Sequence, residues 1–335
     1  MAAELPTTTQ GWELHNVGKA PEKARLTWNT LQPLGVLGPT DVLVKFYAAA
    51  LNYSDVALLE GLAPRIVNEG VVPGADGAGE VMAVGERVSR FRVGDRVLCF
   101  LYQRGYVGGR YPSPDAAHTA IGGAVDGTFR EHGIFDQDGL VRMPLTLSYA
   151  EGAAIMGTYV TTWNCLTGGA SPLRPGGCVL VQGSGAASVS AVQLALAAGA
   201  SVIATTSSDE KAAMLKDLGA SHVINYKQDQ QWGVTAKKLS PGGLGCTHVI
   251  DIIGDADSYS QSLEAVAQGG EIDVVGCMDL SKAMNPGPSL LSALIRKCTI
   301  RGVEVGSRMQ LEEVVHAYQH VSSQKHFGKV VVRVL

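Results

Sequence analysis

Charge of either sign is scarce in this sequence, and neither sign dominates. Charged residues make up 17% of the 335 residues, and 27 Lys plus Arg against 31 Asp plus Glu give a formal net charge of −4. Proteins that bind nucleic acids or anionic membrane surfaces through bulk charge carry a marked excess of basic residues. We therefore expect neither partner, and a small molecule is left as the expected ligand.

Cysteine is also scarce, and long apolar runs are missing. The six cysteines include no CxxC pair, which excludes a disulfide scaffold and a cysteine-rich zinc module. No apolar run approaches the roughly 18 residues of a membrane span, and the first 20 residues lack the pattern of a signal peptide. These absences predict a soluble, cytoplasmic protein with reduced cysteines in its core.

Glycine is the residue in excess, with 41 of 335 positions against a usual share of about 7%. Because the chain has only 14 prolines and no Gly-X-Y repeat, the excess indicates many tight turns between strands and helices. Apolar residues make up 46% of the chain, enough for sizeable cores. The length, about twice the 150-residue prior for one domain, predicts two domains.

The two expected domains differ in their patterns. Residues 1–150 contain short β segments such as Asp41–Phe46, Gly79–Val84 and Asp95–Phe100, which predict an antiparallel barrel or sandwich. From Ser148 onward, continuous apolar strands alternate with helices, the pattern of a doubly wound parallel sheet in an α/β domain. We place this second domain at 151–307 and expect residues 308–335, a helix and a strand, to complete the first.

A glycine-rich turn joins the first strand of the α/β domain to a helix. It reads Gly183-Ser184-Gly185-Ala186-Ala187-Ser188, a GxGxxG-type sequence whose third glycine is replaced by serine. Gly183 permits the turn, Gly185 allows close approach of a pyrophosphate, and the helix N-terminus offers N–H groups to it. This context predicts a dinucleotide site, and a purely structural turn is the alternative.

The end of the next strand indicates which dinucleotide binds. NAD enzymes usually carry an acidic residue there, to bind the ribose hydroxyls, whereas this chain reads Thr206-Ser207-Ser208. Lys211 and Tyr226 could approach the same place, although a solvated lysine and a packing tyrosine are the alternatives. The missing acid together with these residues favours NADPH, whose 2′-phosphate a carboxylate would repel.

Several further segments follow one another in a recognisable order: LNYSDVALLEG (51–61), VPGADGAGEV (72–81), VGDRVL (93–98), DGTFREH (126–132), LSYAEGAAIMGTYVTTW (147–163) and the terminal GKVVVRV. With the glycine turn, they resemble the medium-chain dehydrogenase/reductase superfamily over nearly the whole chain. The run SSDEKAAMLKDLGASHVINY is most similar to its zinc-free quinone oxidoreductases and enoyl reductases. The resemblance implies a GroES-like domain and a Rossmann domain.

The departures from the family pattern bear on the metal. The three zinc-ligand positions of the zinc alcohol dehydrogenases resemble Asn52, Ala75 (followed by Asp76) and Gly157, and the region of the structural zinc contains only Cys99. These residues do not supply the N and S ligands of zinc, so we expect no metal. The implied activity is NADPH-dependent reduction of an activated C=C bond or a quinone. A member with non-redox catalysis or only a binding role is the alternative.

The resemblance also implies site residues. Tyr53 and Asn52 are the expected catalytic residues: Tyr53 would donate to the substrate oxygen, with a purely lining role as the alternative, while Asp55 and Asp76 are expected to be structural. The remaining cofactor contacts would be Thr161, Ile253, Gly254, Gly276, Cys277 and Lys329. The segment 101–120 is the expected substrate rim, with Tyr102, Tyr106 and His118 as candidates.

The strand expected at 299–305 would form the edge of the parallel sheet. Relatives pair this edge across a two-fold axis, which implies a homodimer, with a monomer as the alternative. Relatives also place a helix and a crossing strand after it, whereas this chain passes from Arg308 directly into the last helix at Met309.

Overall fold

The computed structural model describes residues 5–17, 24–61, 66–107, 111–276, 287–289, 291–303 and 331–333. It divides into a β unit, Met1–Gly157 with Lys329–Leu335, and an α/β unit, Thr158–Gly328. The division falls inside helix α2 (Tyr149–Thr167) rather than at the expected residue 150. The expected last helix, the missing elements near 308, Cys277 and Lys329 lie outside the described residues.

The β unit is built on an antiparallel sheet of order β16-β3-β4-β5-β9, with β8 also paired to β3. Its strands are β1 (Thr8–His15), β2 (Arg25–Pro33), β3 (Asp41–Ala50), β4 (Asp76–Val84), β5 (Arg96–Cys99), β6 (Tyr106–Val107), β7 (Tyr111–Pro112), β8 (His132–Asp136), β9 (Leu140–Arg142) and β16 (Val331–Arg333). Alternate residues Val42, Val44 and Phe46 of β3 are buried in one core cluster. The predicted antiparallel β architecture is therefore present.

Three short helical elements lie among these strands, α1 (Tyr53–Leu59), η1 (Pro114–Thr119) and η2 (Gln137–Gly139). The sequence shows no long helical pattern before Ser148, and all three elements are short. Helix α1 is only seven residues long, too short for a clear period of 3.6 residues. Its start is fixed by Asp55, whose carboxylate accepts a hydrogen bond from the backbone N–H of Asn52 (2.7 Å).

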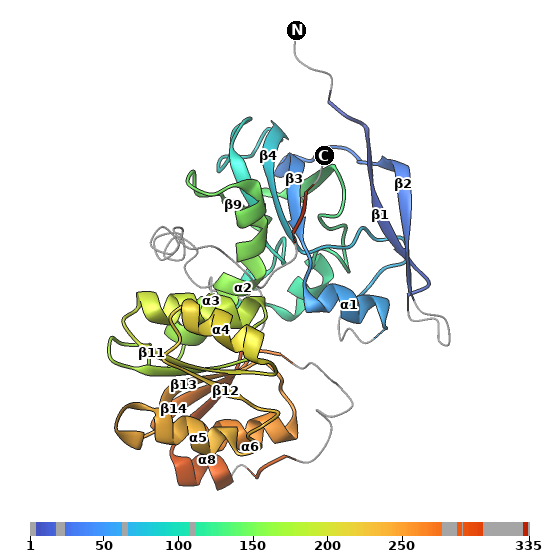
Figure 1. The fold of residues 1–335 in the computed structure, drawn as a ribbon. Coiled ribbons are helices and arrows are strands. Elements are labelled where there is room, and N and C mark those ends of the chain that lie inside the picture. The colour runs from blue at the N-terminus through green and yellow to red at the C-terminus, as the bar shows by residue number, and fades with distance from the viewer. Residues whose placement is uncertain are drawn as a thin grey trace. The chain divides into compact units, whose positions relative to one another are not determined.

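The α/β unit contains a six-stranded sheet of order β12-β11-β10-β13-β14-β15, in which all neighbouring strands are parallel. Its elements are β10 (Cys178–Gln182), α3 (Ala186–Ala197), β11 (Ser201–Thr206), α4 (Asp209–Asp217), β12 (His222–Asn225), α5 (Trp232–Leu239), η3 (Pro241–Gly243), β13 (Cys246–Asp251), α6 (Ala256–Ala265), β14 (Val266–Val274), α8 (Leu291–Arg296) and β15 (Thr299–Gly302). Helices α3 and α4 lie on one face of the sheet, and α5, α6 and α8 lie on the other (Figure 1). The predicted doubly wound parallel sheet is confirmed.

This strand order reverses direction between β10 and β13, which makes their carboxyl ends the topological switch point where Rossmann folds bind dinucleotides. Helix α5, which the sequence analysis did not predict, follows from the same order. Parallel strands require a crossover connection, and the chain must pass from β12 at one edge to β13 beyond β10. Eight residues that include Gly233 give only a weak helical pattern.

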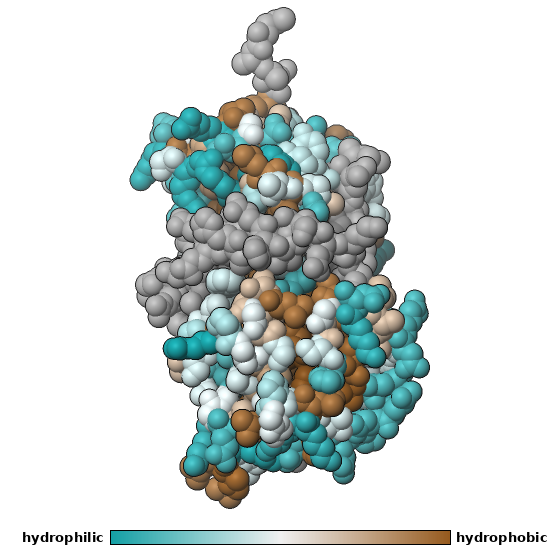
Figure 2. All heavy atoms as spheres, turned by 60° about the vertical axis from the view of Figure 1, so that its left-hand side comes forward, coloured by the Kyte–Doolittle hydropathy of each residue, from teal (hydrophilic) through white to brown (hydrophobic). Residues whose placement is uncertain are grey.

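Hydrophobic residues also reach the surface (brown in Figure 2). Among the described residues of the α/β unit, the most exposed large hydrophobic side chains are those of Leu244, Leu291, Leu294 and Ile295. Three of these belong to α8, which directly precedes the edge strand β15. Within the described parts of the chain, no helix has the length and apolarity that crossing a bilayer requires.

Candidate active site

The glycine-rich turn between β10 and α3 is shaped for a phosphate group. Gly183 has a φ of +79°, and its N–H donates to the carbonyl oxygen of Thr205 (2.9 Å). Gly185 is the N-cap of α3 and provides no side-chain cap, and a Cβ added to it would meet no atom within 4 Å. The first turn of α3 therefore has no side-chain cap from Gly185, and the space beside this residue is open, which fits the pyrophosphate of a dinucleotide.

Serine takes the place of the third glycine in this turn without disturbing it. The side chain of Ser188 is buried, and its hydroxyl donates to the carbonyl oxygen of Gln182 at the end of β10 (2.6 Å). This bond lets helix α3 pack closely on the strand, which is the usual role of the third glycine.

The residues predicted to bind the adenosine ribose meet at the ends of β11 and β12. The N–H of Tyr226 donates to the carbonyl oxygen of Thr206 (3.0 Å), and Ser208 caps α4 by accepting from the N–H of Lys211 (3.4 Å). The hydroxyl of Thr206 is buried and, among the described residues, has no hydrogen-bond partner. A buried hydroxyl with unused hydrogen-bonding capacity fits a polar ligand at this strand end.

The turn after β13 carries the predicted residues Ile253 and Gly254. The N–H of Gly254 donates to the carboxylate of Asp251 (3.0 Å), and the N–H of Ile253 donates to the side-chain oxygen of Gln182 (3.4 Å). Gly276, after β14, lies against the same turn, because a Cβ there would be 2.4 Å from the carbonyl oxygen of Ile252. Thr161 is buried in α2.

Sequence reasoning missed Gln182 and Asp251. Both are polar residues that directly follow an apolar stretch at the end of a strand (CVLVQ and CTHVID), a signal that could have identified them. Both are buried at the switch point, with Asp251 fully inaccessible.

In the β unit, the carboxylate of Asp76 joins Asn52 and Gly157, two positions that resemble zinc-ligand positions of the zinc alcohol dehydrogenases. Asp76, at the start of β4, is buried and accepts hydrogen bonds from the side-chain amide of Asn52 (2.9 Å) and from the N–H of Gly157 in α2 (2.9 Å). A Cβ on Gly157 would lie 2.8 Å from Oδ2 of Asp76. Asp76 is thus a structural acid here, and its position leaves no room for a ligand side chain at residue 157.

The described residues do not fit a zinc ion. Ala75 has no donor atom, and no group of three His, Cys, Asp or Glu side chains suited to a metal occurs in the described ranges. Cys99 is part of the hydrophobic core of the β unit, and burial raises the pKa of its thiol far above the ordinary value. A single cysteine also cannot supply the four N or S ligands of a structural zinc site.

Tyr53, the predicted donor, is the first residue of α1, next to Asn52, and its side chain is 47% exposed. Tyr53 is therefore accessible to solvent and adjoins Asn52 in the sequence.

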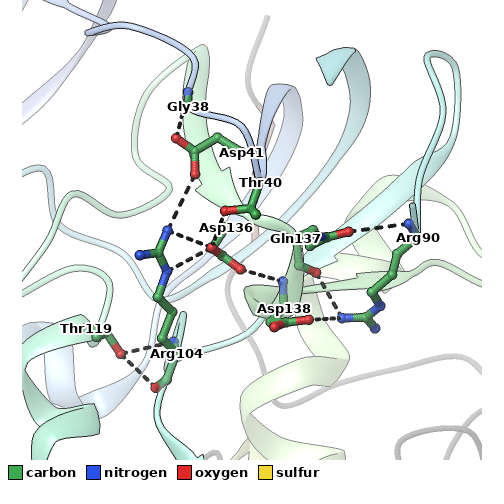
Figure 3. A network of polar contacts seen from close by, with 9 residues as sticks. All are labelled: Gly38, Thr40, Asp41, Arg90, Arg104, Thr119, Asp136, Gln137 and Asp138. Atoms are coloured by element: carbon green, nitrogen blue, oxygen red, sulfur yellow. Dashed lines mark hydrogen bonds and ion pairs between the residues drawn. The ribbon is translucent and has the colours of Figure 1, made fainter. Parts of the chain in front are cut away.

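The expected rim segment is anchored at its base by Arg104 (Figure 3). Its guanidinium donates to the carboxylate of Asp136 (Nε to Oδ2, 2.8 Å), and its backbone N–H and carbonyl oxygen bind the hydroxyl of Thr119 (3.2 and 3.1 Å). The side chain of Tyr102 is buried in one cluster with Ala116 and Ala120, and its role at the rim stays a prediction.

The two other rim candidates differ in what the structure describes. His118 is exposed within η1. Tyr106 lies in β6, and only its backbone is described.

Comparison with known proteins identifies both units. Residues 38–145 match the family model of the alcohol dehydrogenase GroES-like domain, and residues 186–320 match that of zinc-binding dehydrogenases. The chain is 38% identical to a zinc-type alcohol dehydrogenase-like protein of Schizosaccharomyces pombe, over 89% of this chain and 92% of that protein. It is 28% identical to the quinone oxidoreductase of Mus musculus, over 77% of this chain and 70% of that protein.

A solved structure from Sinorhizobium meliloti 1021, described as an alcohol dehydrogenase, superimposes with a TM-score of 0.86 and 30% identity over 99% of this chain and 100% of that chain. The GroES-like and Rossmann folds predicted from the sequence are thereby confirmed. The glycine-rich turn lies at the switch point, where proteins of this fold family bind a nicotinamide cofactor. The chain belongs to the medium-chain dehydrogenase/reductase superfamily and is an oxidoreductase of that family.

Proposed function

We propose that the protein is an NADPH-dependent, zinc-independent reductase of an activated C=C bond, as in an enone or enoyl compound, or of a quinone. The observation that carries the proposal is the Asp76 carboxylate, which binds Asn52 and the backbone of Gly157 where zinc alcohol dehydrogenases hold their metal. Two ligand positions are thereby engaged with a carboxylate, and the third, Ala75, has no donor.

The choice of substrate class follows from the missing Lewis acid. Oxidation of an unactivated alcohol depends on strong polarisation of its oxygen, which zinc supplies in the metal-dependent enzymes. Conjugated carbonyl compounds and quinones accept hydride more readily, because the negative charge spreads onto an oxygen that hydrogen-bond donors can stabilise. Bound NADPH would supply the hydride.

Tyr53 and Asn52 are the proposed donors to that oxygen. An amide NH2 group has two hydrogens, and Asp76 accepts one from Asn52, which fixes the orientation of the amide. The hydrogen bond from the Asn52 backbone to Asp55 fixes the start of α1 and with it the backbone of Tyr53. Asp55 and Asp76 act in this scheme by positioning Asn52 and Tyr53.

The preference for NADPH is supported by the end of β11. Thr206, Ser207 and Ser208 carry hydroxyls and no charge, and Lys211 lies in the first turn of α4. A cation near the 2′-phosphate would favour NADPH through a charge-assisted contact.

Calorimetry on Lys211→Ala tests this preference. We expect NADPH to bind about tenfold more weakly, since one charged contact is worth roughly 1.5 kcal/mol, with NADH binding unchanged. Lys216→Ala, in the last turn of the same helix, is the matched control and should bind both as the wild type does. Equal or tighter binding of NADH by the wild-type protein would refute the preference.

The reaction itself is tested by following the loss of NADPH absorbance with enones, enoyl thioesters and quinones, in parallel with NADP+ reduction by a panel of alcohols. We expect turnover in the first assay that a chelator leaves unchanged, and no zinc by elemental analysis. Stoichiometric zinc together with chelator-sensitive alcohol oxidation would overturn the proposal. Cofactor binding with no turnover of any substrate would instead favour the non-redox alternative.

A homodimer through β15 is the proposed assembly. Within the described residues, β15 pairs only with β14, and a sheet edge of this kind invites pairing with another strand. The exposed Leu291, Leu294 and Ile295 on the neighbouring helix α8 add apolar surface that a two-fold contact would bury.

A further inference from the structure

Two buried polar side chains end the two strands at the switch point. Gln182 is the last residue of β10, and Asp251 is the last residue of β13. Both follow buried apolar residues, Leu180 and Val181 in β10 and Val249 and Ile250 in β13, so they are the polar ends of buried stretches. Burying a carboxylate is costly unless several donors satisfy it, so the contacts of these side chains indicate what they do.

Gln182 holds the turn that follows β13. Its side-chain oxygen accepts hydrogen bonds from the N–H groups of Ile252 (3.2 Å) and Ile253 (3.4 Å). Its side-chain nitrogen donates to the hydroxyl of Ser262 in α6 (3.0 Å). Gln182 is also the residue whose carbonyl oxygen binds Ser188 of the glycine-rich turn. The two turns on either side of the switch point are therefore linked through one residue.

Asp251 holds the same turn from its other end. Its Oδ1 accepts from the N–H of Gly254 (3.0 Å) and from the hydroxyl of Ser258 (3.1 Å), and its Oδ2 accepts from the hydroxyl of Ser262 (2.8 Å). All three donors are neutral, and burial raises the pKa of this carboxyl above its ordinary value. Its contacts are with the turn and with Ser258 and Ser262 of α6, so they fix the path of the chain between β13 and α6.

The position of this turn decides which half of the cofactor it serves. Rossmann sheets consist of two mononucleotide-binding halves, and the ribose-binding strand end identifies the adenosine half. That strand end is Thr206–Ser208, so the adenosine half belongs to β10, β11 and β12. The turn after β13 lies in the other half, which serves the nicotinamide side.

We propose that Gln182 and Asp251 are positioning residues that hold the Ile252–Gly254 turn in the conformation that the nicotinamide half of the cofactor requires. The proposal rests on the proposed cofactor-binding function. It adds the expectation that this network affects NADPH and NADH equally, because both cofactors share the nicotinamide half, whereas Lys211 distinguishes them at the adenosine half.

Binding of three probes to the full chain tests the proposal: NADPH, NADH and adenosine 2′,5′-bisphosphate, which lacks the nicotinamide half. Asp251→Asn keeps the shape of the side chain but replaces one acceptor oxygen by an NH2 group, which cannot accept a hydrogen bond from the donors around it. Gln182→Met removes both acceptor contacts at similar volume. For each variant we expect NADPH and NADH affinity to fall about tenfold, in line with the loss of a buried hydrogen bond, and affinity for the bisphosphate to stay within about twofold of wild type.

Two further variants keep the result interpretable. Ser262→Ala removes a hydroxyl that joins Gln182 and Asp251 and should give a smaller, roughly threefold loss, even if Asp251→Asn does not fold. His248→Asn is the matched control, because His248 is buried on the same strand but contacts the carbonyl oxygen of Ser171 instead of the turn (2.9 Å). It should leave the affinity for all three probes unchanged.

The outcomes separate this inference from the proposed function. Equal weakening of the bisphosphate and of both cofactors, or no weakening of either cofactor, would overturn the positioning role. Failure of the wild-type protein to bind any nicotinamide cofactor would refute the proposed function first, and the positioning role with it. Wild-type binding with unaffected variants would refute only the positioning role.

Discussion

Replacing Asp76 by alanine is expected to destabilise the β unit by about 3 kcal/mol. The buried carboxylate accepts one hydrogen bond from the Asn52 amide and one from the Gly157 N–H, each 2.9 Å long. Hydrogen bonds to a charged group contribute about 1.5–3 kcal/mol each. We take the lower value for both, because the Asn52 side chain is partly accessible to water.

The change is measured by urea unfolding followed by circular dichroism, with Asp138→Ala as the control. The Asp138 side chain is 64% exposed and forms one ion pair with Arg90 (3.2 Å), so its loss should cost less than about 1 kcal/mol. Asp76→Asn, which retains one acceptor oxygen, should fall between the two. If Asp76→Ala were no more destabilising than Asp138→Ala, the carboxylate would not be what holds Asn52 and Gly157 together.

Three further predictions concern other parts of the molecule. Burial raises the pKa of Asp273 on β14 to about 8 although Arg301 lies beside it, so the folded protein holds this proton more tightly than the unfolded chain does. The free energy of unfolding should therefore fall as the pH rises from about 4 to about 8. In urea titrations, Asp273→Asn should reduce this pH dependence, and an unchanged dependence would contradict the pKa of Asp273. Arg104→Ala should raise the KM for the substrate without changing the Kd for NADPH, because it releases the base of the rim segment only; a change in both would point to unfolding of the unit. Light scattering at micromolar concentration should give twice the chain mass of 35.1 kDa, and a mass near 35.1 kDa would refute pairing through β15.

Much of the fold could be predicted because its signals are local. The apolar runs of β10, β11, β13 and β14 and the helices between them follow from hydrophobic periodicity. The turn at Gly183 follows from a backbone conformation that glycine adopts most easily. The short helices α1 and α5 could not be recognised, because seven or eight residues carry little periodicity. The crossover that contains α5 becomes a requirement only when the strand order is known.

Only the parts of the candidate site that depend on one short segment of the chain could be predicted. The neutral end of β11 and the residues at the zinc-ligand positions could be recognised along the chain. A structural role was expected for Asp76, but its partners could not be predicted, because Asn52 and Gly157 lie 24 and 81 positions away. The burial of Tyr102 was equally hidden, since it depends on packing against η1.

The sequence by itself determined the two folds, the place of the glycine-rich turn and the residue types at the positions that resemble zinc ligands, because each depends on residue types within a short stretch of chain. The tertiary structure decided which side chains meet: the carboxylate of Asp76 with Asn52 and Gly157, and Gln182 with the turn after β13, 70 positions away. Hydrogen bonds act only between atoms about 3 Å apart, and only the folded topology brings groups so distant in the sequence within that range.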